Sequence, residues 1–168
     1  MTAIVFLGVF PALMAFAAAY DLTTMTIPNK LTAAVALAFI AVVALCRLPA
    51  TEVAWHLAAG LLVLTVTFAM FAAGWMGGGD AKLAAGVALW LGFADLLDYF
   101  MLASILGGVL TIALLAARRY PLPLLLTRVP WAQKLHAPET GIPYGIALAI
   151  AALAILPHAQ IMLRAFSG

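Results

Sequence analysis

The segment VAWHLAAGLLVLTVTFAMFAAG, residues 53–74, contains no Asp, Glu, Lys or Arg. A helix of this length is long enough to cross the apolar core of a bilayer. Similar runs fill most of the chain and give six candidate membrane segments: residues 3–20, 31–46, 53–74, 81–95, 99–117 and 144–163. They are continuous blocks of Ala, Leu and Val without alternating polar positions, which favours helices over the strands of a β-barrel.

The composition of the whole chain agrees with this pattern. Of the 168 residues, 67% are hydrophobic and 8% are charged, and the mean hydropathy is +1.19. We therefore expect a single all-α, polytopic membrane domain over residues 1–168, with about six transmembrane helices and a lipid bilayer around it. The one sizeable loop, about 118–143, contains several prolines and is expected to hold a short interfacial segment. The basic residues are scattered, so no nucleic-acid partner is expected.

The segment WMGGGDAKLAAG, residues 75–86, follows the first quoted run and raises the question of function. It places three glycines before an aspartate: Gly77, Gly78, Gly79 and Asp80. Without a Cβ atom, these glycines allow a substrate backbone to approach the carboxylate and allow the chain to turn with a positive φ. Lys82 is a candidate for tuning the carboxylate or contacting a substrate. Its alternative role is a topology charge that reaches the membrane interface.

A second carboxylate, Asp21, ends the first apolar run and opens the polar segment DLTTMTIPNK. Pro28 disfavours helix at the residue before it. Asn29 is then a candidate N-cap for a helix that starts near Lys30. Because an even number of crossings separates Asp21 from Asp80, we expect both carboxylates on the same side of the membrane.

The basic residues predict which side this is. Six of them lie on the same side as the aspartates: Lys30, Lys82, Arg118, Arg119, Arg128 and Lys134. The other two, Arg47 and Arg164, lie on the opposite side. Lys and Arg are enriched in cytoplasmic loops. The aspartates are therefore expected at the cytoplasmic face, with both termini outside.

Two carboxylates at one membrane face suggest acid–base chemistry. Close carboxylates cannot both ionise easily and share a proton, as in aspartic proteases, where one activates water and the other protonates the scissile carbonyl. One alternative is that Asp80 is only a helix N-cap and Asp21 a solvated helix-end residue. Another is a small transporter or assembly subunit that uses Asp21 and Asp80 as a proton or cation site. Transporters more often place such residues at mid-bilayer.

Other side chains offer no competing chemistry. His56, His136 and His158 lie far apart in this topology and Cys46 is the only cysteine, so we expect neither a metal site nor a cofactor. The four tryptophans fall near segment ends and are expected to be interface anchors: Trp55, Trp75, Trp90 and Trp131.

Three motifs resemble those of the type IV prepilin peptidases. GGGDAK, residues 77–82, resembles the GxGD signature of membrane aspartyl proteases, and DLTTMTIPN, residues 21–29, is similar to the family's first-aspartate region. GIPYGIALA, residues 141–149, is similar to the Pro-aromatic-Gly stretch that opens the last helix. The motifs occur in the family's order, and they contribute four structural positions: Pro28, Asn29, Pro143 and Gly145.

The resemblance implies that Asp21 and Asp80 are the catalytic aspartates of an enzyme without a cofactor. Its substrate would be a prepilin, cut between a basic leader and a hydrophobic helix at the cytoplasmic face of the bacterial inner membrane. The short chain is similar to the small peptidases of tight-adherence (Flp) pilus systems. Larger members carry an insert with paired CxxC motifs that accompanies N-methylation of the product. That insert is not seen here, so the sequence gives no indication that the product is N-methylated.

The presenilin and signal-peptide-peptidase branch is the alternative among GxGD proteases. It also uses Tyr-Asp, which occurs here as Tyr20–Asp21, and Pro-Ala-Leu, which occurs at residues 11–13. In that branch, however, Pro-Ala-Leu follows GxGD, the helices are more numerous and the aspartates lie deeper. The order of motifs in this sequence therefore favours the prepilin peptidases.

Overall fold

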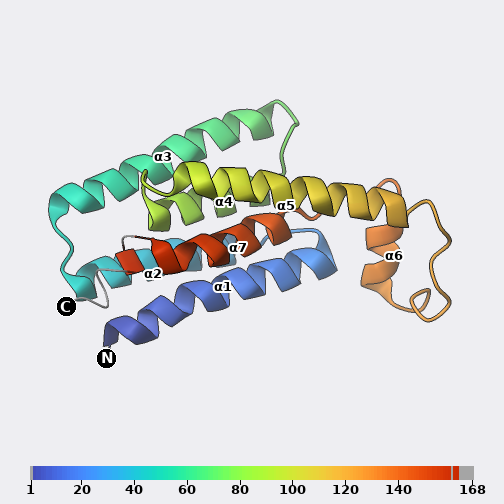
Figure 1. The fold of residues 1–168 in the computed structure, drawn as a ribbon, viewed down its shortest axis with the longest axis horizontal. Coiled ribbons are helices and arrows are strands. Elements are labelled where there is room, and N and C mark those ends of the chain that lie inside the picture. The colour runs from blue at the N-terminus through green and yellow to red at the C-terminus, as the bar shows by residue number, and fades with distance from the viewer. Residues whose placement is uncertain (1, 160, 163–168) are drawn as a thin grey trace.

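The protein is a bundle of helices in the computed structural model, which describes residues 2–159 and 161–162 (Figure 1). These residues contain no strand, so the prediction of an all-α fold is confirmed. The elements are α1 (Thr2–Thr24), α2 (Asn29–Cys46), α3 (Ala50–Ala72), α4 (Gly78–Leu91), α5 (Leu96–Ala117), α6 (Pro130–His136), α7 (Tyr144–Ile155) and the 3-10 helix η1 (Leu156–His158).

Four helices are long and apolar enough to cross a membrane: α1, α2, α3 and α5. The fourth expected span, 81–95, lies at α4, which has 14 residues. The last one, 144–163, is shorter than the sequence indicated, because α7 has 12 residues before the chain tightens into η1. The last expected span also includes residues 160 and 163, which lie outside the described part. The bundle therefore combines four helices of membrane-spanning length with two short apolar ones.

The short helix α4 lies in the middle of the bundle. It packs against α2, α3 and α7, while α1 packs against α2 and α7, and α5 against α7. Most α4 side chains are buried. A helix surrounded by protein on several sides does not need to reach both membrane surfaces, which accounts for its length.

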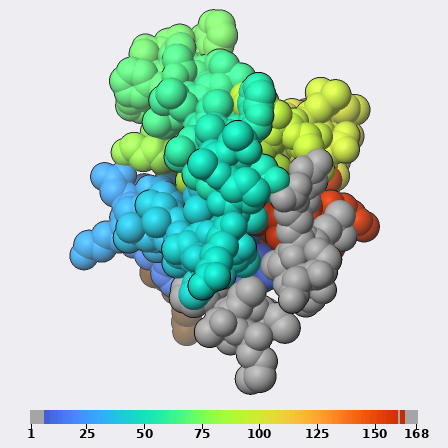
Figure 2. All heavy atoms as spheres, turned by 90° about the vertical axis from the view of Figure 1, so that its left-hand side faces the viewer, coloured from blue at the N-terminus to red at the C-terminus, as the bar shows by residue number. Residues whose placement is uncertain are grey.

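The connections alternate between the two ends of the bundle (Figure 1). One end gathers the α1–α2 turn, the α3–α4 turn, α6 and the start of α7, and the opposite end holds the α2–α3 and α4–α5 turns. Figure 2 views the molecule from that opposite end, with the α2–α3 turn facing the reader. Asp21 and Asp80, close to the α1–α2 and α3–α4 turns, thus belong to one end of the molecule, as the parity of the crossings predicted.

Trp90 anchors the core and not an interface, so the prediction for this tryptophan was wrong. Its side chain is completely buried, and its indole N–H donates a hydrogen bond to the carbonyl oxygen of Val35 at 3.0 Å. The ring also packs against Phe10, with 4.6 Å between ring centroids. Because α4 is packed against α2, α3 and α7, a tryptophan near its end faces protein and not a membrane surface. Trp55 and Trp75, in contrast, are well exposed.

The loop between α5 and α7 contains the short helix α6, as its prolines predicted, and it is tied to the bundle. The Arg118 guanidinium donates hydrogen bonds to the carbonyl oxygens of Leu135, Thr140 and Gly141 at 2.8–3.2 Å. Lys134 donates to the carbonyl oxygen of Thr24, the last residue of α1, at 2.6 Å. These bonds fix the extended segment that leads into α7.

Candidate active site

Asp21 lies in the last turn of α1 and is only 4% exposed. The backbone N–H groups of Gly145 and Ile146, in the first turn of α7, interact with its carboxyl group. A Cβ atom at Gly145 would lie 2.7 Å from Asp21 Oδ2 and 2.6 Å from Ile27 Cδ1, which is closer than side chains can pack. Gly145 therefore allows the carboxyl group to lie against the start of α7.

Asp80 is the third residue of α4 and is half-buried. The N-cap of α4 is Gly77, with no capping bond from a side chain, so the alternative in which Asp80 is the N-cap is wrong. A Cβ atom at Gly77 would lie 3.0 Å from Asp80 Oδ2. The carboxyl group thus turns back over the beginning of its own helix.

Ile27, in the turn between α1 and α2, lies between the two aspartate segments. A Cβ atom at Gly79 would lie 3.0 Å from Ile27 Cβ and 3.2 Å from its backbone nitrogen, and the other side of Ile27 meets Gly145. The two carboxyl groups are close enough for the charge of Asp21 to act on Asp80. Asp21 Oδ2 is buried and has no hydrogen-bond partner among the described residues. The structure therefore brings both aspartates into one cluster.

Asp80 opens into a cavity of about 990 Å³. The walls come from α3, α5, the turn before α4 and the start of α7, and they are mainly apolar. The polar lining side chains are few: Thr67, Asp80, Ser104 and Tyr144. A large apolar cavity with a few convergent polar groups is typical of a binding site.

The comparison with protein families shows which family the chain belongs to. A model of the type IV leader peptidase family matches residues 8–112, which is more than half of the chain and includes both aspartates. The chain belongs to the type IV leader peptidase family. The resemblance drawn from the motifs is thus confirmed. No curated protein and no solved structure matched the chain. The third motif, at the start of α7, lies outside the matched range.

In this family member the glycines before Asp80 make contacts inside the protein. A Cβ atom at Gly78 would lie 3.1 Å from the ring of Phe71, and a Cβ atom at Gly79 would lie 3.0 Å from Ile27 Cβ. The positive φ that we expected in the triplet occurs instead at Gly74, with a value of 77°. Of the three glycines, Gly77 lines the cavity beside Asp80. Close approach by a substrate therefore remains a proposal for Gly77, whereas Gly78 and Gly79 allow α4 to pack closely.

Lys82 and Asn29 contact each other and join two of the motifs. The Lys82 ammonium group donates a hydrogen bond to Asn29 Oδ1 at 2.8 Å. The predicted capping role of Asn29 was wrong, because α2 begins at Asn29 itself, with Pro28 as its N-cap and no capping bond from a side chain. Pro143 occupies the equivalent place before α7, which begins at Tyr144 as the motif indicated.

Tyr99, on α5, is a neighbour of the site that sequence reasoning missed. Its side chain is completely buried and its hydroxyl group has no hydrogen-bond partner among the described residues. The charge of Asp80 acts on this hydroxyl group. A tyrosine near the start of an apolar helix reads as an interface anchor, so no local signal connected it with Asp80.

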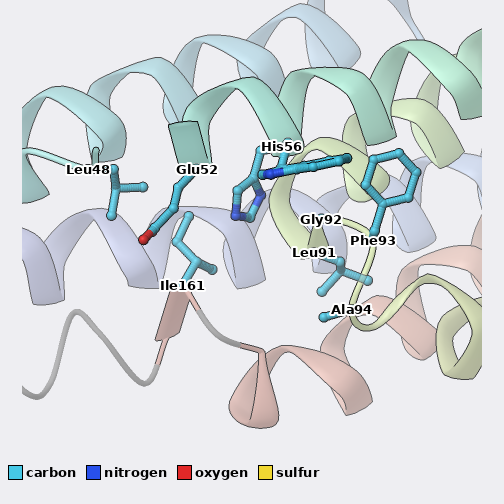
Figure 3. A pocket seen from close by; sticks show the side chains of 9 residues that line it. Leu48, Glu52, His56, Leu91, Gly92, Phe93, Ala94 and Ile161 are labelled. Carbon is cyan, nitrogen blue, oxygen red and sulfur yellow. The ribbon is translucent and has the colours of Figure 1, made fainter. Parts of the chain in front are cut away.

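A smaller cavity, of about 330 Å³, lies at the other end of the bundle and includes His56 and Glu52 (Figure 3). His56 Nδ1 is 2.9 Å from the carbonyl oxygen of Leu89, so this ring is part of the contact between α3 and α4. Over residues 2–159 and 161–162, no three His, Cys, Asp or Glu side chains gather as a metal site.

Proposed function

We propose that this protein is a prepilin peptidase, a membrane-embedded aspartic endopeptidase that removes the leader from type IV, Flp-like prepilins. The observation that carries the proposal is that Asp21 and Asp80 come from different helices and lie close enough for their charges to interact, with Ile27 packed against the segments of both. Membership of a leader peptidase family supports the same reaction. A transporter site is the less favoured alternative, because this family relationship points to peptide cleavage.

The reaction needs only the two carboxyl groups and a water molecule. The ionised carboxylate takes a proton from water, whose oxygen attacks the scissile carbonyl carbon, while the protonated carboxyl group donates to the carbonyl oxygen. Collapse of the tetrahedral intermediate breaks the C–N bond, and a proton passes to the departing amine. The pair begins and ends with one shared proton, so no cofactor is consumed.

We further propose that cleavage takes place at the cytoplasmic face of the bacterial inner membrane. Six of the eight Lys and Arg residues are assigned by the topology to the side of the aspartates, and positive residues favour the cytoplasm. Arg164, one of the two assigned to the other side, lies outside the described residues.

The test is substitution of each aspartate by asparagine, which has nearly the same shape but cannot exchange a proton in this way. Asp21→Asn and Asp80→Asn should each remove almost all leader cleavage from a co-expressed prepilin, measured as a mobility shift. The double variant should be little worse, because groups that act as a unit are not additive. Asp98→Asn, at an exposed position near the start of α5, is the control. Normal cleavage by both single variants at normal membrane levels would disprove the proposal.

A further inference from the structure

Helices α3 and α5 leave a groove between them. α3 packs against α4 and α5 packs against α7, but along their described residues α3 and α5 do not pack extensively against each other. In Figure 1, α3 diverges from α5 toward the end where the chain turns into α4. In Figure 2, the green atoms of α3 lie mainly at the upper left and the yellow-green atoms near the start of α5 at the upper right, with the start of α3 between them. The cavity that contains Asp80 lies in this space.

The walls of this α3–α5 groove are mainly apolar. α3 and α5 contribute seven apolar side chains to it: Leu62, Val63, Val66, Met70, Leu96, Phe100 and Ala103. From Leu62 to Met70 the groove follows α3 for about 12 Å, or roughly two helical turns. Thr67 in its wall is already satisfied, since its hydroxyl group bonds the carbonyl oxygen of Val63 at 2.7 Å.

The polar end of the groove is the active-site end. Asp80 and the exposed backbone of Gly77 lie there together with Gly141 and Ile142, which belong to the extended segment before α7. Arg118 holds that segment in place through the carbonyl oxygen of Gly141 at 3.0 Å. The groove therefore passes from an apolar channel to extended backbone and a carboxyl group within one continuous surface.

The described residues leave part of the groove uncovered on its outer side. Val66, in its α3 wall, is 51% exposed although the side chain is apolar. Lipid contacts apolar helix surfaces without cost, so an apolar helix can enter such a groove from the side and pack against its walls. A polar or charged segment could not do so without losing its hydration.

We propose that the α3–α5 groove binds the first two turns of the substrate's hydrophobic helix, which places the preceding peptide bond beside Asp80. The inference rests on the proposed function, in which the bond before a hydrophobic helix is cut. The start of that helix must then lie within a few residues of Asp80, and the groove is the apolar surface that begins there. Its length matches two turns of helix. The leader then lies on the polar side, beyond Asp80.

Bulk added to the groove should block the helix without touching the aspartates. Val66→Trp should lower kcat/KM at least tenfold for a synthetic peptide with a basic leader, a glycine and a 20-residue apolar helix, in detergent or vesicles. Leu64→Trp is the matched control, because this exposed α3 side chain does not line the groove. This control variant should keep kcat/KM within about twofold of the value for the unmodified protein.

Disulfide cross-linking tests the same contact without added bulk and does not depend on the folding of the tryptophan variant. In a Cys46→Ala background, Val66→Cys should cross-link to a cysteine in the second turn of the peptide helix, and Leu64→Cys should not. Equal cross-linking at both positions, or full activity of a folded Val66→Trp variant, would overturn the groove assignment while cleavage itself stands. If the unmodified protein cuts neither this peptide nor a co-expressed prepilin, the proposed function fails, and the groove assignment fails with it.

Discussion

At Gly145 a single hydrogen atom takes the place where any other residue would have a carbon. The missing Cβ leaves room for the Asp21 carboxyl group and for the end of the Ile27 side chain, both within 2.7 Å of the position it would occupy. Adding a methyl group there has to displace one or both of them. The position of Asp21 relative to Asp80 depends on this contact, so Gly145 controls the geometry of the pair.

We expect Gly145→Ala to lower leader cleavage about a hundredfold, because displacement of a reacting group by about 1 Å has effects of that size. Gly108→Ala, in α5, is the matched control, since a Cβ atom there meets nothing within 4 Å. This control should cleave normally and be slightly more stable, as alanine favours helix. The measurement is the cleavage rate at equal membrane levels, and equal rates for both variants would contradict the role given to Gly145.

Gly79 has a comparable role on the other side of Ile27. Gly79→Val should abolish most cleavage and cost about 1–3 kcal/mol of stability, because the added carbons meet the backbone of Ile27 and overpack the contact. Membrane insertion should be retained. Thermal unfolding in detergent, followed together with cleavage, checks both effects. Normal processing with unchanged stability would show that the start of α4 does not need this close contact.

At the scale of elements, α4 positions Asp80 because it is short and central. Its neighbours α2, α3 and α7 surround it, and its first turn lies at the end of the bundle that also holds Asp21. The bond between Lys82 and Asn29 ties this turn to the start of α2, directly after the turn that contains Ile27. The two aspartate segments are thus connected by an apolar contact and a polar one.

A double-variant cycle measures the polar connection. Asn29→Ala and Lys82→Met should each lower cleavage about fivefold, equivalent to about 1 kcal/mol for one hydrogen bond to a charged group near the surface. The double variant should be no worse than either single one, since both remove the same bond. Lys30→Met removes an exposed charge at the same end and should have little effect. Additive losses would mean that the two residues act independently.

For the whole molecule, the alternation of turns between the two ends predicts the membrane topology. Reporter fusions after Lys30, after Lys82 and within the loop 118–143 should all report the cytoplasm, and a fusion after Arg47 should report the opposite side. The reason is the distribution of positive charges together with the parity of the crossings. If the Lys30 and Lys82 fusions report different sides, the aspartates cannot form one site.

The sequence alone determined the features that depend on neighbouring residues. Runs of apolar residues specified an all-α membrane bundle, and Pro28 and Pro143 marked the starts of α2 and α7 within a residue. Counting the crossings was enough to place Asp21 and Asp80 at one end. Hydropathy and proline geometry act over a few residues or one helix, so they can be read without knowing how the helices pack.

Only the tertiary structure decided which partner each side chain has. Asn29 had the local preference of an N-cap, yet its side chain binds Lys82, which lies 53 residues further along the chain. Trp90 occupied a segment end by sequence but fills the core, because α4 is enclosed by its neighbours. Ile27 lies between Gly79 and Gly145 because the packing of α4 and α7 brings these two glycines to the turn between α1 and α2. Contacts between distant segments are set by the packing of whole helices, and no local pattern encodes them.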